Sequence, residues 1–325
     1  MRNQAVKALV IFLVAFSVLA VAGKVFAQGW FKTSSGPSGE RITLINVEGA
    51  ISGSAAAASP FGESGASSVY IAEQLHQAAR SNDIKGVLLR VNSPGGSAAA
   101  SDEIYQGVMA VRNAGKPVVV SMGDVAASGG YYISAAADKI YANGATLTGS
   151  IGVIFSLMNW EELADKWGVD DVTLHAGEYK DIGSPWRQMT DKEKEMMQEL
   201  LDDVHEEFMQ AVIAGRSNAP NPMTEEQVRA AATGMIYTGT KAKELGLVDE
   251  IGGLEEAKAE VRRMANVGQD FPVEPEAAPS LLEELLGVSM QGQAPNPLAR
   301  FVADPLSLMA GRLYMNTTLR DIVLR

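Results

Sequence analysis

Two apolar stretches, each followed by a glycine-rich turn, constrain the fold more than any other feature of this chain. Residues 84–92 (IKGVLLRVN) and 116–123 (KPVVVSMG) are apolar over most of their length, which is typical of strands covered on both faces of a parallel sheet. A helical pattern follows the first turn and continues to about Val111. Strands that alternate with helices in this way predict an α/β domain.

Further elements are predicted around these two strands. Helical periodicity covers residues 68–80, 160–168, 191–214, 224–232, 239–245 and 253–265, and shorter apolar runs at 42–49, 139–144, 151–158 and 171–177 predict strands. We therefore expect one domain over residues 42–268. A polar linker at 29–41 precedes it, and a proline-rich linker and tail at 269–325 follow it.

The N-terminal 28 residues carry the clearest local signal. Two basic residues precede an uncharged apolar run over residues 8–23, which with its flanks can cross a membrane as a helix. Small residues before Gln28 resemble a signal-peptide cleavage site, so the segment is either a removable signal or an uncleaved anchor. Lys24 separates the run from that site and favours an anchor over residues 1–28. The early positive charge keeps the N-terminus in the cytoplasm and the rest of the chain outside it.

Composition excludes several classes of function. The net charge of −12 over 325 residues argues against nucleic-acid binding. The chain has no cysteine, which removes disulfides, thiolate nucleophiles and cysteine-rich zinc sites. Its three histidines are His76, His175 and His205, so a histidine base must be one of these. We expect no cofactor and no metal.

The segment NSPGG at 92–96 follows a predicted strand and precedes a predicted helix. Gly95 and Gly96 let the backbone approach a ligand closely, and amides at the start of a helix favour negative charge. The segment could be a phosphate loop, a simple turn or an oxyanion hole. No Walker-type lysine follows, which disfavours the phosphate loop.

Ser128 has the same setting one strand later, in VAASGGYYISAAA. It could simply be the N-cap of a helix. Alternatively it is an exposed nucleophile, with Gly129 leaving room for a substrate. The two motifs on consecutive strands are more specific together than either is alone, and together they favour a nucleophile beside an oxyanion hole.

A serine nucleophile needs a base. His175 falls in a predicted strand and His205 on a long predicted helix, so neither lies in an obvious catalytic loop. A lysine can replace histidine where burial favours its neutral form. Lys180, in HAGEYKDIGSPW, follows a predicted strand among tyrosine, isoleucine and tryptophan. Spacing alone does not show that it reaches Ser128.

Four segments, VNSPGG, GDVAASGGYYISAAADKIYA, TGSIGV and GEYKDIGSPWRQMT, occur in this order. Together they resemble the signal peptide peptidase A family of membrane-anchored Ser-Lys proteases, in its short, single-domain bacterial form. The resemblance covers about residues 42–265. It implies that Ser128 is the nucleophile and Lys180 the general base. Ser150 would orient the lysine amine, and the oxyanion hole would use backbone amides of Gly95 or Gly96 together with Gly129.

The same resemblance implies a fold, an assembly and a substrate class. The fold would be the spiral of βα units shared by ClpP proteases and crotonases, behind one N-terminal transmembrane helix. The assembly would be a ring-like homo-oligomer with active sites at subunit interfaces. The substrates would be signal peptides left in the membrane and other unfolded or hydrophobic peptides. The alternatives are a crotonase-like acyl-CoA enzyme and an inactive scaffold that binds peptides.

Overall fold

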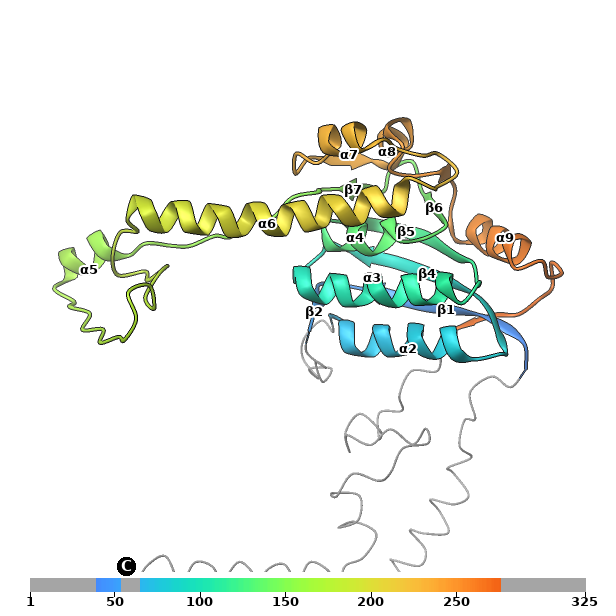
Figure 1. Cartoon of the computed structure of the whole chain (residues 1–325), viewed down its shortest axis with the longest axis horizontal. Coiled ribbons are helices and arrows are strands. Elements are labelled where there is room, and N and C mark those ends of the chain that lie inside the picture. The colour runs from blue at the N-terminus through green and yellow to red at the C-terminus, as the bar shows by residue number, and fades with distance from the viewer. Residues whose placement is uncertain (1–38, 54–64, 276–325) are drawn as a thin grey trace, which may run out of the picture. The chain divides into compact units, whose positions relative to one another are not determined.

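The computed structural model describes residues 39–53 and 65–275 (Figure 1). The predicted anchor at 1–28 and the tail beyond residue 275 lie outside these described residues. Among the helices that are described, none has the length and apolar character needed to cross a membrane.

The main sheet of the described residues is mostly parallel. Its central path runs in the order β10-β1-β4-β5-β6-β9, all paired in parallel. These strands are β1 (Arg41–Glu48), β4 (Ile84–Ser93), β5 (Val118–Ala127), β6 (Lys139–Ala142), β9 (Glu250–Ile251) and β10 (Val273–Pro275). The end of β5 also pairs with β7 (Leu147–Gly149), and β8 (Ile236–Thr238) lies antiparallel to β7. A small second sheet joins β2 (Ile51–Ser52) to β3 (Ala66–Ser67).

Both faces of the sheet are covered, as the continuous apolar strands predict. Successive residues of a strand point to opposite faces. Leu89 of β4 belongs to the large core under α2 (Ser68–Arg80), α3 (Ala98–Asn113) and α4 (Gly129–Ala135). Leu88 belongs to a second cluster with Ala257 and Val261 of α9 (Leu254–Met264), on the other face. The predicted α/β class is confirmed as a mixed α/β fold with a mainly parallel sheet.

The longest described helix, α6 (Asp191–Arg216), joins two different environments. Its buried residues lie almost all in its C-terminal half, from Phe208 onward, where it packs on α4. Its N-terminal half is largely exposed and leads back to α5 (Glu161–Trp167). Figure 1 shows α5 beyond the far end of α6, away from the sheet. We call residues 152–190 the arm. The helices α7 (Glu225–Ala231) and α8 (Gly239–Leu245) follow α6.

Two predicted strands are wrong. Residues 151–158 and 171–177 form no strand, and both belong to the arm except for Ile151. A strand needs a neighbour for its backbone hydrogen bonds, and the arm offers none. Their apolar side chains are therefore not part of a sheet: Ile154 is 89% exposed and Leu174 is 93% exposed.

Candidate active site

Ser128 lies between the carboxyl end of β5 and the first turn of α4. It occupies the N-cap position, but its side chain makes no cap hydrogen bond. Its backbone has φ 52° and ψ −121°, a region that a residue with a side chain rarely adopts and that costs free energy. Its N–H donates to the carbonyl oxygen of Gly149 at 2.9 Å, which holds this conformation. A capping role does not explain this serine.

The glycines around Ser128 are required by close packing. A Cβ atom on Gly95 would lie 2.8 Å from the Cβ of Ser128 and 2.7 Å from the nitrogen of Gly129. A Cβ atom on Gly129 would lie 2.4 Å from Oγ of Ser101. The NSPGG turn after β4 is therefore pressed against the serine turn after β5, and the two motifs form one site.

The backbone amides in this site are not equivalent. The amide of Gly95 donates to Oγ of the buried Ser93 at 3.1 Å. The amides of Gly96 and Gly129 donate to no acceptor within residues 39–53 and 65–275. The Cβ position of Gly129 lies 3.3 Å from the nitrogen of Gly96, so these two amides are close neighbours. Of the three predicted oxyanion glycines, Gly96 and Gly129 have the available donors.

Ser150 is brought beside Ser128 by the sheet. The register of β5 and β7 pairs Ala127 with Gly149, so the next residues, Ser128 and Ser150, lie at the ends of adjacent strands. Neighbouring strands are about 4.8 Å apart. Ser150 also has a positive φ of 51°, and its N–H donates to the carbonyl oxygen of Met235 at 2.7 Å.

Lys180 is not brought to Ser128 within one chain. It lies in the arm and is exposed, and its loop is tied by ion pairs to Glu193 at the start of α6. The contact of α6 with the helix behind Ser128 begins at Phe208, whose ring lies 4.8 Å from that of Tyr132. About 22 Å of helix separates Glu193 from Phe208 at 1.5 Å per residue. No lysine side chain spans that length.

The arm loop is held by one arginine between two carboxylates. Arg187 donates from Nε and Nη2 to both oxygens of Asp181, at 2.7 and 2.9 Å, and from Nη1 and Nη2 to Glu193, at 2.8 and 2.6 Å. Glu193 also accepts from the backbone N–H of Thr190 in a capping box. Hydrogen bonds from Arg187 lower the pKa of Asp181 to about 2, and they do the same for Glu193, helped by the Thr190 amide.

These lowered pKa values predict how the arm responds to acid. The ordinary values are 3.8 for Asp181 and 4.5 for Glu193. A carboxylate whose folded pKa is lowered stabilises the fold above its ordinary pKa, and this contribution is lost as pH falls toward about 2. We expect the arm to loosen between pH 4.5 and about 2, followed by tryptophan fluorescence in a Trp30→Phe background, which leaves only arm tryptophans. A transition centred above pH 4.5, with the body still folded by circular dichroism, would contradict the clamp.

The histidines do not supply a base near Ser128. His175 lies in the arm, with its Nε2 3.8 Å from Oδ1 of Asp181. His205 lies on α6 and His76 on α2. No hydrogen bond or ion pair between the described residues joins any of the three to Ser128.

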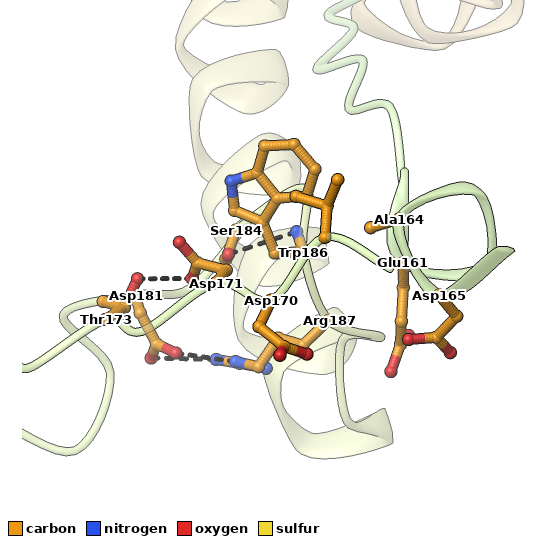
Figure 2. A pocket seen from close by; sticks show the side chains of 11 residues that line it. Glu161, Ala164, Asp165, Asp170, Asp171, Thr173, Asp181, Ser184, Trp186 and Arg187 are labelled. Carbon is orange, nitrogen blue, oxygen red and sulfur yellow. Dashed lines mark hydrogen bonds and ion pairs between the residues drawn. The ribbon is translucent and has the colours of Figure 1, made fainter. Parts of the chain in front are cut away.

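A pocket of about 350 Å³ lies in the arm, not at Ser128 (Figure 2). It is lined by Trp186, Arg187 and several carboxylates, of which Figure 2 shows Asp181 joined to Arg187. Within the described residues, no group of three or more histidine or acidic side chains could hold a metal ion. All of the residues that line the pocket belong to the arm, so the pocket is separate from the site at Ser128.

Comparisons with known proteins find similarity to peptidases. Residues 110–268 match the model of peptidase family S49, and residues 61–146 match the model of Clp protease. A Methanocaldococcus jannaschii protein named as a protease is 40% identical over 63% of this chain and 64% of its own length. An Enterococcus faecium protein named as a signal peptide peptidase is 37% identical over 68% of this chain and 63% of its own length. Protease 4 of Haemophilus influenzae is 36% identical over 72% of this chain and 36% of its own length.

Over residues 61–268 the chain is similar to two classes of peptidase, Clp protease and peptidase family S49. Residues 110–268 match the model of peptidase family S49, and the predicted resemblance to the signal peptide peptidase A family is confirmed by this match and by the similar Enterococcus protein. The chain spans just under two thirds of the length of the first two relatives.

Proposed function

We propose that this chain is a membrane-anchored serine endopeptidase that uses a Ser-Lys dyad. The observation that carries the proposal is Ser128 itself. It is strained, makes no cap bond, and lies beside the unoccupied amides of Gly96 and Gly129. The peptidase family match and the Clp-like arrangement of βα units support the same assignment.

In the proposed mechanism, Oγ of Ser128 attacks the carbonyl carbon of a peptide bond. Its proton passes to the neutral Nζ of Lys180, which therefore acts as general base. The oxygen that becomes negative accepts hydrogen bonds from the amides of Gly96 and Gly129. Lys180 then gives its proton to the leaving amine, and water hydrolyses the acyl-enzyme by the same route. Ser150, beside Ser128, would hold the lysine amine in place.

The separation of Lys180 from Ser128 leads us to propose that each site is shared. The arm of one subunit would bring Lys180 to Ser128 of its neighbour in a ring-like homo-oligomer. The exposed side chains of the arm support this, since soluble surfaces rarely leave so many large apolar residues uncovered. Trp167 is 77% exposed and Met158 is 70% exposed, in addition to Ile154 and Leu174.

We also propose the location and the substrates. The apolar run at residues 8–23 would anchor the chain, with the N-terminus in the cytoplasm and the catalytic domain outside it. Signal peptides left in the membrane, and other unfolded or hydrophobic peptides, would be the substrates. The names of the Enterococcus and Haemophilus relatives, a signal peptide peptidase and a protease, support this choice. The Clp-like spiral fold would place the sites toward the inside of the ring.

A fluorophosphonate probe tests the nucleophile. We expect the probe to label the full chain and the Ser128→Ala change to abolish labelling, because only an activated serine reacts. Ser217→Ala is the matched control, since Ser217 is exposed at the C-terminal end of α6 and its hydroxyl makes only local hydrogen bonds, to Ala214 and Asn218. Unchanged labelling of the Ser128→Ala variant would refute the assignment. An acyl-CoA enzyme would instead turn over a thioester without Ser128, and a peptide-binding scaffold would bind peptides without labelling.

A further inference from the structure

Lys180 has a carboxylate on each side of it in the sequence. Glu178 precedes it by two residues and Asp181 follows it directly. An opposite charge within about 4–6 Å favours the charged form of an ionisable group. A lysine that acts as general base must be neutral, so an ion pair with either carboxylate would oppose its proposed role.

The structure pairs both carboxylates with other cations. Both oxygens of Asp181 accept from Arg187, at 2.7 and 2.9 Å. Glu178 lies 3.8 Å from Nζ of Lys192, which also donates to the hydroxyl of Tyr179. The side chain of Lys180 makes no ion pair or hydrogen bond with any residue in 39–53 or 65–275. Both carboxylates next to Lys180 are therefore paired with other cations. The amine of Lys180, the proposed base, has no partner among the described residues.

Arg187 is well placed to keep Asp181 occupied. Its planar guanidinium binds the carboxylate through two parallel hydrogen bonds, a stronger and more directional arrangement than one ammonium gives. Its other side is fixed to Glu193, whose side chain is 5% exposed and belongs to the rigid first turn of α6. Asp181 has a pKa of about 2, so it carries its full charge wherever a lysine base works. His175, 3.8 Å from Asp181, is the remaining titratable neighbour.

We propose that Arg187 is a positioning residue that withdraws the carboxylate of Asp181 from Lys180 and thereby sets the pH range of activity. The proposal rests on the proposed role of Lys180 as base. It adds that the ion pairs of the arm keep both neighbouring carboxylates away from Lys180. Loss of Arg187 should therefore change the protonation of Lys180 and not only its position.

The test is the pH dependence of kcat/KM for the full chain on a peptide substrate. In the Arg187→Gln variant, Asp181 is free to pair with Lys180, so the rise of kcat/KM should move about one to three pH units to the alkaline side. In the double variant Arg187→Gln, Asp181→Asn the competing charge is gone, and the midpoint should return toward that of the unchanged chain. Arg187→Lys keeps a cation beside Asp181 and should lie between the two.

The chain offers a matched control for this experiment. Arg229 also bridges two exposed carboxylates, Glu206 and Glu225, but does so between α6 and α7. Arg229→Gln should leave the pH midpoint unchanged. If Arg187→Gln lowers kcat/KM equally at all pH values, or if the double variant recovers nothing, Arg187 only holds the arm together and the proposal is overturned. Near-normal activity of Lys180→Ala would instead overturn the proposed base.

Discussion

Mixing two inactive variants, Ser128→Ala and Lys180→Ala, should restore peptidase activity. Each variant alone should lose at least about 10³-fold in kcat/KM, because nucleophile and base act as a unit. The proposed ring takes the serine of each site from one subunit and the lysine from its neighbour. Random mixing at equal amounts in a head-to-tail ring then makes roughly one site in four complete. The expected result is about a quarter of the normal activity.

The control mixes the Lys180→Ala variant with a chain that carries both changes. Neither chain then carries Lys180, so no site can be complete in any geometry and no activity should return. Subunit exchange is checked by co-purification through a tag on only one of the two chains. Exchanged but inactive rings in the main experiment would show that serine and lysine come from the same chain, and the arm would have to fold back onto its own body.

The described residues outside the arm, which we call the body, could largely be predicted from the sequence. Their apolar side chains are buried by the chain itself. The apolar strands β4 and β5 and the periodic helices around them reflect contacts within the chain itself. The strand at residues 273–275 is harder to predict, because Pro272 and Pro275 disrupt the strand pattern. It forms because β10 is an edge strand, where a proline without an N–H is tolerated.

The structure of the arm could not be predicted from the sequence pattern. Its apolar residues follow the pattern of buried strands, but a sequence pattern does not show whether a residue is in fact buried by the rest of the chain. Two strands are therefore predicted where the structure has an exposed loop. The same limit applies to Lys180, which is 52 residues from Ser128 by number and separated from it by most of the length of α6.

The sequence predicts that the two glycine-rich turns lie together, but not the geometry that they adopt. NSPGG and ASGG mark the two turns, yet nothing in the letters shows that Ser128 has a positive φ or that the Gly95 amide is already bound by Ser93. The ion pairs of Arg187 with Asp181 and Glu193 are also absent from the sequence-based predictions. The available signal was an arginine seven residues after the candidate base, in a loop with two nearby carboxylates.

Removing Asp249 should destabilise the body more than any surface change. Asp249 pairs with Arg216 at the root of α6, at 2.6 Å between Oδ1 and Nη2, and their side chains are 1% and 0% exposed. Breaking a buried ion pair by removing one partner leaves the other charge without compensation, which costs about 3–5 kcal/mol. We expect Asp249→Ala to lower the free energy of unfolding of the full chain by about this amount.

The measurement must report on the body and not on the arm. All four tryptophans lie at residue 30 or in the arm, so far-UV circular dichroism in urea is the suitable probe. The exposed partner Glu206 of Arg229 is the matched control, and Glu206→Ala should change stability little, because exposed ion pairs contribute little. The double variant Arg216→Met, Asp249→Leu should be more stable than Asp249→Ala, since it leaves no unpaired charge. If the double variant is no more stable than the single one, the C-terminal end of α6 is stabilised by the hydrogen bonds from Arg216 to Gly246 and not by the ion pair.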